Sequence, residues 1–185
     1  MIYVALLRGI NVGGNSKVDM KQLAACFSAA GLSAVSTYIN SGNVIFASPK
    51  SAQQLVPELE SVIAQTFGFT VKVLLRTIDD ISAICRALPD DWQNNADMKC
   101  DVLFLWDEVN QAATLDALKL KDDIEDGVYL AAGGAILWRI DRPNVTKSRV
   151  LKLIGTPLYK QMTIRNCNTV RTLHKKMALV TDTST

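Results

Sequence analysis

Apolar and polar residues along the first part of the chain form blocks that predict strands and helices in the order β-α-β-β-α-β. Short apolar runs bounded by turn residues predict strands, and apolar residues repeating every three or four positions predict amphipathic helices. The predicted strands cover residues 3–7, 34–39, 44–47 and 71–75, and the predicted helices cover 20–30 and 55–67. This order is that of the ferredoxin-like fold, in which two helices cover a four-stranded antiparallel sheet.

The second part of the chain shows a similar, less regular pattern. Helical periodicity at residues 78–88 precedes a strand at 102–106, a short helix at 112–118, and two strands, 128–132 and 135–140, on either side of Gly133-Gly134. Helical patterns resume at 149–154 and 169–180, and no Gly/Ser/Pro-rich linker separates the two parts. We therefore predict an α+β protein of two closely packed ferredoxin-like units with antiparallel sheets. The units are expected near residues 1–76 and 77–185, the second decorated with extra C-terminal helices.

The composition of the 185 residues, 49% hydrophobic and 21% charged, is that of a globular protein with a sizeable core. No apolar stretch approaches the roughly 20 residues that span a bilayer. The four cysteines are dispersed without a C-x-x-C pair, which favours buried free thiols and a reducing, cytoplasmic setting. Net charge is uneven: +3 over residues 1–76, −9 over 77–126 and +8 over 127–185. Two interpretations stay open, a basic segment that pairs internally with the acidic one and a basic surface for a polyanion.

The glycine-rich, basic stretch R-G-I-N-V-G-G-N-S-K-V-D from Arg8 to Asp19 lies between the first strand and the first helix. It lacks the Lys-Ser/Thr of a P-loop after Gly14, and its glycines do not match a dinucleotide fingerprint. Glycines and amides at a helix entry are nevertheless typical of anion-binding loops. The alternative is a loop that uses its glycines only to turn, with Lys17 in solvent.

A second basic entry to a helix is T-I-R-N-C-N-T, residues 163–169. Asn168 or Thr169 is expected to cap the last helix, which leaves Arg165 and Asn166 just before its N-terminus. A guanidinium group beside free helix amides suits a carboxylate or a phosphate. The alternative is that Arg165 and Asn166 bind neighbouring carbonyls or the acidic segment.

Three motifs together resemble an uncharacterised bacterial family, domain of unknown function 1697: R-G-I-N-V-G-G at the N-terminus, T-Y-I-N-S-G-N-V-I-F at residues 37–46, and T-I-R-N-C-N-T-V at residues 163–170. They span nearly the whole chain. The resemblance implies a compact α+β protein with ferredoxin-like halves and implies no activity.

Chemistry-bearing residues outside these motifs are few. His174 is the one histidine, and it adjoins the core stripe of the last helix, where a surface role is favoured over a general base. The acidic pairs, such as Asp79-Asp80 and Asp122-Asp123, have no metal-ligand spacing and fit capping or solvation. We expect no metal and no cofactor.

Three classes of function therefore compete. We favour binding of a phosphorylated or other anionic small ligand in a cleft between the two units. The predicted contacts are Arg8, Asn11, Gly13, Gly14 and Lys17 on one wall and Arg165, Asn166 and Thr169 on the other. An enzyme acting on such a ligand would need an acid or base that no motif supplies. A nucleic-acid-binding or scaffold protein would use the basic C-terminal segment, although the sheet offers few aromatic residues for base stacking.

Overall fold

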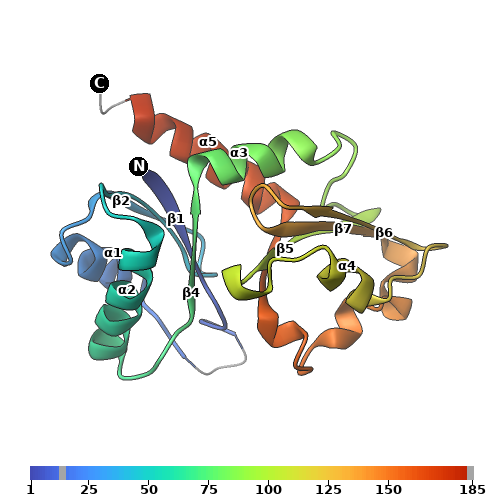
Figure 1. Cartoon of the computed structure of the whole chain (residues 1–185), viewed down its shortest axis with the longest axis horizontal. Helices are drawn as coiled ribbons and strands as arrows, with labels where there is room; N and C mark the ends of the chain where they lie inside the picture. Colours follow the sequence, from blue (N-terminus) through green and yellow to red (C-terminus); the bar gives the residue numbers. More distant parts are fainter. Residues whose placement is uncertain (13–15, 183–185) are drawn as a thin grey trace. The chain divides into compact units, whose positions relative to one another are not determined.

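The computed structural model describes residues 1–12 and 16–182, and the contacts within the chain define two compact units. Unit 1 comprises Met1–Ile78 together with Leu173–Thr185, and unit 2 comprises Asp79–Thr172. Figure 1 shows the order of the elements along the chain. None of the helices in the described ranges is long and apolar enough to cross a membrane.

Unit 1 is built on a four-stranded antiparallel sheet in the strand order β2-β3-β1-β4. Its elements are β1 (Ile2–Leu7), α1 (Met20–Ala29), β2 (Ser33–Tyr38), β3 (Asn43–Ala47), α2 (Ala52–Phe67) and β4 (Val73–Thr77). The central strand β1 pairs with β3 on one side and β4 on the other. The predicted β-α-β-β-α-β order is therefore confirmed, with strand ends within two residues of those expected.

The unit 1 core lies between the sheet and α1 and α2, which Figure 1 shows beside each other. Alternate residues of β1, Tyr3, Ala5 and Leu7, pack there against apolar residues of the two helices, among them Leu23 and Leu59. Helix α1 begins where Asp19, as expected, accepts a hydrogen bond from the amide of Gln22 at 2.8 Å. The start of α1 is therefore set by the Asp19 cap, and its apolar face is buried in the unit 1 core.

Unit 2 repeats the arrangement, with a four-stranded antiparallel sheet in the order β6-β7-β5-β8. Its elements are α3 (Ile78–Ala87), β5 (Met98–Leu105), η1 (Asp107–Val109), α4 (Ala113–Leu118), β6 (Glu125–Leu130), β7 (Ala135–Asp141), η2 (Arg142–Lys147), η3 (Leu151–Leu153), η4 (Tyr159–Gln161), β8 (Met162–Asn166) and the start of α5 (Cys167–Asp182). The two sheets have the same topology, so the predicted α+β fold of two ferredoxin-like units, the second with a C-terminal helix, is confirmed.

Two local predictions in unit 2 are wrong. The helical pattern at residues 149–154 forms only the short 3₁₀ turn η3, which ends where Ile154 leaves the helical conformation (φ −53°, ψ 124°) and Gly155 has φ +89°. The last helix is capped by Asn166 rather than by Asn168 or Thr169, because α5 follows β8 directly. The side-chain oxygen of Asn166 accepts a hydrogen bond from the amide of Thr169 at 2.8 Å.

Helix α5 belongs to both units. Its first residues lie in unit 2, and its later part, from Leu173 onward, is counted with unit 1. There the ammonium group of Lys176 lies 5.6 Å from the centre of the Tyr38 ring on β2, a cation–π contact.

Candidate functional site

Asn11 joins the two described parts of the loop between β1 and α1, residues 8–12 and 16–19. Its amide oxygen accepts the backbone N–H of Val18 at 2.8 Å, and its amide nitrogen donates to the carbonyl of Val18 at 3.0 Å. Its backbone N–H donates to the carbonyl of Ser16 at 3.1 Å. Asn11 has φ +55°, a left-handed conformation that asparagine tolerates better than most residues. These bonds fix residues 11, 16 and 18 relative to one another.

The same asparagine joins the first motif to the second. Its amide nitrogen also donates to the carbonyl of Asn40 at 2.9 Å, in the turn between β2 and β3. In that turn Gly42 has φ +74°, and a Cβ atom there would lie 2.8 Å from side-chain atoms of Ile10 and Leu7. The two motifs, separated by more than twenty residues in the sequence, therefore meet at one end of the unit 1 sheet.

Three cationic residues lie at this end of the sheet. Arg8 is half-buried, and its backbone N–H donates to the carbonyl of Lys72 at 3.1 Å, so the two residues are neighbours at the ends of β1 and β4. Lys17 and Lys72 are exposed. The neighbouring carboxylate of Glu60 accepts the amide of Val73 at 2.9 Å and so stabilises the backbone beside Lys72.

Lys72 was absent from the predicted site because nothing near it in the sequence resembles a motif. The predicted fold could have identified Lys72, because in the ferredoxin-like topology the last strand pairs with the first. This pairing places the start of β4 beside the end of β1. Gly13 and Gly14, two of the predicted contacts, lie outside the described residues. Of the predicted residues in the loop, the structure therefore describes Arg8, Asn11 and Lys17.

The second predicted group, Arg165, Asn166 and Thr169, lies in unit 2 at the junction of β8 and α5. Arg165 is buried, and its guanidinium donates to the hydroxyl of Thr163 at 3.0 Å and to the carbonyl of Ile164 at 2.9 Å. Burial lowers the pKa of Arg165 to about 10, so it is still charged at neutral pH. The side chain of Arg165 thus binds the neighbouring Ile164 carbonyl, and that of Asn166 binds the amide of Thr169.

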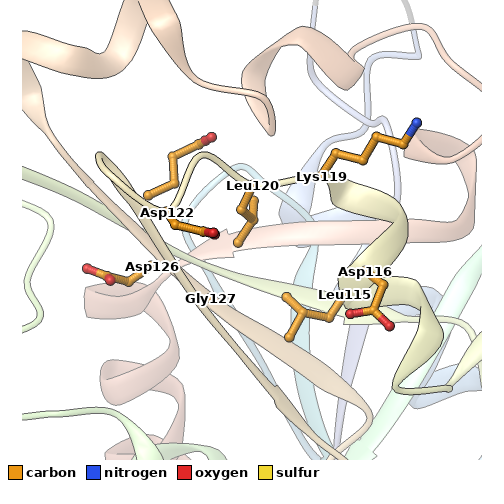
Figure 2. Close-up of a pocket in the computed structure, with 8 residues that line it drawn as sticks. Leu115, Asp116, Lys119, Leu120, Asp122, Asp126 and Gly127 are labelled. Carbon is orange, nitrogen blue, oxygen red and sulfur yellow. The ribbon is translucent and has the colours of Figure 1, made fainter.

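A pocket of about 460 Å³ lies between α4 and β6 in unit 2 (Figure 2). It is lined by Leu115, Asp116, Lys119, Leu120, Asp122, Glu125, Asp126 and Gly127. Figure 2 shows the amino group of Lys119 directed away from Asp122 and Asp126. Four carboxylates against one amine disfavour an anion in this pocket. It is therefore not the site predicted from the basic motifs.

One of these carboxylates is part of the fold. Glu125 is buried and accepts the hydroxyl of Ser148 at 2.7 Å and the amide of Arg149 at 3.0 Å. Burial alone would raise the pKa of Glu125, but the hydrogen bonds from Ser148, Arg149, Lys121 and Val150 outweigh it and hold the pKa below its ordinary value. Within residues 1–12 and 16–182, no three His, Cys, Asp or Glu side chains group in a way that could hold a metal ion.

Comparison with known proteins gives a family and a fold. The model of a family described as "Protein of unknown function (DUF1697)" matches residues 1–136. The chain is similar to the solved structure of the conserved bacterial protein SP0830 from Streptococcus pneumoniae, with 34% sequence identity and a TM-score of 0.80. That match covers 95% of this chain and 98% of the other. No curated protein matches the chain. The likeness thus extends over both units and carries no activity with it.

Proposed function

Since the chain belongs to the family of proteins of unknown function DUF1697, whose description names no activity, we propose a function from the loop itself: binding of a phosphorylated or other anionic small ligand. The proposed site lies in unit 1, at the end of the sheet where β1, β4 and the β2–β3 turn meet. We place this function in the cytoplasm of a bacterium, as the composition and the relative's source suggest.

The observation that carries the proposal is the bonding of Asn11. Asn11 takes part in four hydrogen bonds, which fix the described ends of the loop at residues 11, 16 and 18 and join them to Asn40. A site built in advance loses little conformational entropy when a ligand binds. A loop that served only to connect β1 to α1 would not need this anchoring, because connecting loops tolerate variation.

Charge supports the same assignment. Arg8, Lys17 and Lys72 contribute three positive charges around the loop. The two carboxylates at this end, Asp19 and Glu60, accept the backbone amides of Gln22 and Val73. Since both carboxylates stabilise the backbone, we favour binding over an enzymatic reaction.

The test is a thermal-shift measurement with pyrophosphate, AMP, glucose 6-phosphate and a short oligonucleotide, each at constant ionic strength. A ligand at 100 times its Kd stabilises the folded protein by about 2.7 kcal/mol. For a chain of this length that corresponds to a rise in Tm of about 5–11 °C. Arg8→Gln and Lys17→Ala should each remove most of the shift.

Lys50→Ala is the matched control. Lys50 is exposed in the same unit and follows the opposite end of β3, where it pairs with Glu58 at 2.7 Å. The Lys50→Ala substitution should leave the ligand-induced rise in Tm unchanged. If Arg8→Gln and Lys17→Ala respond to every anion as the parent does, the loop is only a turn and the proposal fails. A response to the oligonucleotide alone, falling steeply with salt, would instead support a nucleic-acid-binding surface.

A further inference from the structure

Two cysteines far apart in the sequence, Cys100 and Cys167, face each other in unit 2. The ladder between β5 and β8 ends with Asp101 opposite Asn166, so the next residues outward are Cys100 and Cys167. The last paired positions of an antiparallel ladder have Cα atoms about 4.5–5.5 Å apart, and Cys100 and Cys167 are the immediate neighbours of such a pair, Cys167 as the first residue of α5. A disulfide requires Cα atoms roughly 4.4–6.8 Å apart. The thiol of Cys100 donates a hydrogen bond to the sulfur of Cys167.

The surroundings of the two sulfurs differ. The hydrogen bond from Cys100 lowers the pKa of Cys167 against the opposing effect of burial, and the charge of Arg171 and the amide of Asn94 lower it further, to about 7. The nearby Asp101 acts in the opposite direction but is itself paired with Lys99 at 2.8 Å. The same contact with Cys167, together with burial, raises the pKa of Cys100. One member of the pair is therefore a thiolate for much of the time at neutral pH, and the other is a thiol.

Arg171, whose charge lowers the pKa of Cys167, is held near that residue by hydrogen bonds. It lies one helical turn after Cys167 on α5, and its guanidinium donates to the carbonyls of Trp92 at 2.7 Å and Pro89 at 2.9 Å. The sulfur of Cys167 lies 3.6 Å from the carbonyl oxygen of Trp92 and 3.4 Å from the side-chain oxygen of Asn168. These two oxygens can accept the proton of the neutral thiol, so both protonation states of Cys167 have partners.

The segment of residues 89–97 lies against Cys167 and limits access to it. Both cysteines are fully buried. The segment is held by polar contacts: Asn168 donates to the carbonyl of Asn94 at 2.9 Å, and Arg142 donates to the carbonyl of Asn95 at 2.9 Å. Segments held mainly by exposed hydrogen bonds open locally at low cost. Small neutral reagents should therefore reach Cys167 more readily than bulky ones.

We propose that Cys100 and Cys167 are a redox-active dithiol site that reduces hydrogen peroxide and closes to a disulfide. The thiolate of Cys167 attacks one peroxide oxygen, the O–O bond breaks, and the leaving hydroxide takes a proton to become water. This leaves Cys167 as a sulfenic acid. Cys100 then loses its proton and attacks the sulfur of Cys167, the S–O bond breaks, and a second water leaves. The two thiols supply the two electrons that hydrogen peroxide takes up.

The other cysteines serve as internal controls. Burial raises the pKa of Cys26 and of Cys85. Cys26 donates to the carbonyl of Leu23 in α1, in unit 1. Cys85 on α3 also experiences the charge of Arg171, which makes it the competitor that the experiment has to distinguish. Cys85→Ser is thus the matched control for Cys100→Ser.

The experiment treats the reduced full chain with hydrogen peroxide at pH 7, followed by unfolding, alkylation with N-ethylmaleimide and mass spectrometry. The parent should lose two hydrogens and keep two of four alkylation sites, and digestion should yield one linked pair containing Cys100 and Cys167. Cys85→Ser should behave as the parent. Cys100→Ser should lose the link completely and leave Cys167 as a sulfenic acid that dimedone traps.

The pH profile is the second readout. With a pKa of about 7, the rate of oxidation of Cys167 should rise only about twofold from pH 7 to pH 9. The oxidation rate of a free thiol with a pKa of about 8.5 would rise roughly 25-fold over the same pH interval. The proposal is overturned if the folded parent forms no Cys100–Cys167 link while a free cysteine peptide is oxidised, if the link involves Cys85, or if the rate follows the free-thiol profile. These measurements on the parent stand even if a serine variant does not fold.

Discussion

Replacing Glu125 by glutamine should destabilise unit 2 strongly, although the two side chains have nearly the same shape. Glu125 opens β6, and its carboxylate binds a segment more than twenty residues later, at Ser148 and the amides of Arg149 and Val150. It also accepts the amide of Lys121 at 3.2 Å. Glutamine retains one acceptor oxygen and directs an NH₂ group at donors.

The magnitude follows from those contacts. A hydrogen bond to a charged group contributes about 1.5–3 kcal/mol, and a buried donor left without a partner costs about 1–3 kcal/mol. Since glutamine can keep part of the network, we expect a loss of about 2–4 kcal/mol in the free energy of unfolding. The corresponding fall in Tm is about 4–16 °C. Asp126→Asn is the control, because Asp126 is exposed and its pair with Arg139 contributes at most about 1 kcal/mol.

The loss should depend on pH with a definite sign. The pKa of Glu125 is lower in the folded state than in the unfolded chain, so the unfolded state binds more protons as the pH falls. The carboxylate's contribution is therefore complete above the unfolded pKa of about 4.3 and is lost as the pH falls through the folded value. The difference between parent and Glu125→Gln should be constant from neutral pH to about pH 5.5 and shrink below about pH 4.3.

Urea unfolding followed by tryptophan fluorescence measures the difference in the free energy of unfolding between the parent and Glu125→Gln, and it does so for unit 2. All three tryptophans, Trp92, Trp106 and Trp138, lie in unit 2, so their emission reports on that unit, while far-UV circular dichroism reports on both. If Glu125→Gln is no more destabilising than Asp126→Asn, or if the difference is as large at pH 3 as at pH 7, the carboxylate network does not hold unit 2 together.

Two further substitutions test the loop end of unit 1, with urea unfolding followed by circular dichroism as the measurement. Gly42→Ala should cost about 2–4 kcal/mol, because a Cβ atom there would clash with Leu7 and Ile10 at a positive φ. Gly31 also has a positive φ, but a Cβ atom there would meet no other atom, so Gly31→Ala should lower the free energy of unfolding by only about 1–2 kcal/mol. Equal losses for Gly42→Ala and Gly31→Ala would contradict the clash. Asn11→Ala should lower the free energy of unfolding by about 2–3 kcal/mol, because it removes the side-chain hydrogen bonds and places alanine at a left-handed φ. Asn11→Gly should lower it by about 1 kcal/mol less, because glycine also lacks the hydrogen bonds but adopts that φ without strain. Equal losses for the two variants would refute the backbone contribution.

The sequence was informative where one periodicity ran without interruption. The buried run of β1 and the stripe of α2 predicted the unit 1 elements closely, because an apolar face has to be buried whatever it packs against. The turn at Gly133-Gly134 was predicted equally well, because consecutive glycines are favoured in hairpin turns that require a positive φ. Both residues have a positive φ in the structure. Between β7 and β8 the periodicity predicted a helix that does not form, because the backbone leaves the helical conformation at Ile154 and Gly155, just after η3.

The candidate sites depended on contacts that no local pattern contains. That Asn11 binds Asn40, and that Lys72 lies beside Arg8, follow from strand pairing rather than from spacing in the sequence. The pairing of Cys100 with Cys167 requires the register of β5 against β8, which a shift of one residue would destroy. Propensity and periodicity identify buried faces and do not identify which buried faces meet.

The division of α5 between the units has a consequence for biosynthesis. Unit 1 is discontinuous in sequence, because it takes in residues from Leu173 onward as well as Met1–Ile78. A ribosome that synthesises the chain from its N-terminus therefore releases the final piece of unit 1 only after every residue of unit 2 has been made. The usual order, in which an N-terminal domain is complete before the next one emerges, does not hold here. A nascent chain stalled after Ile78 would carry Tyr38 without its partner Lys176.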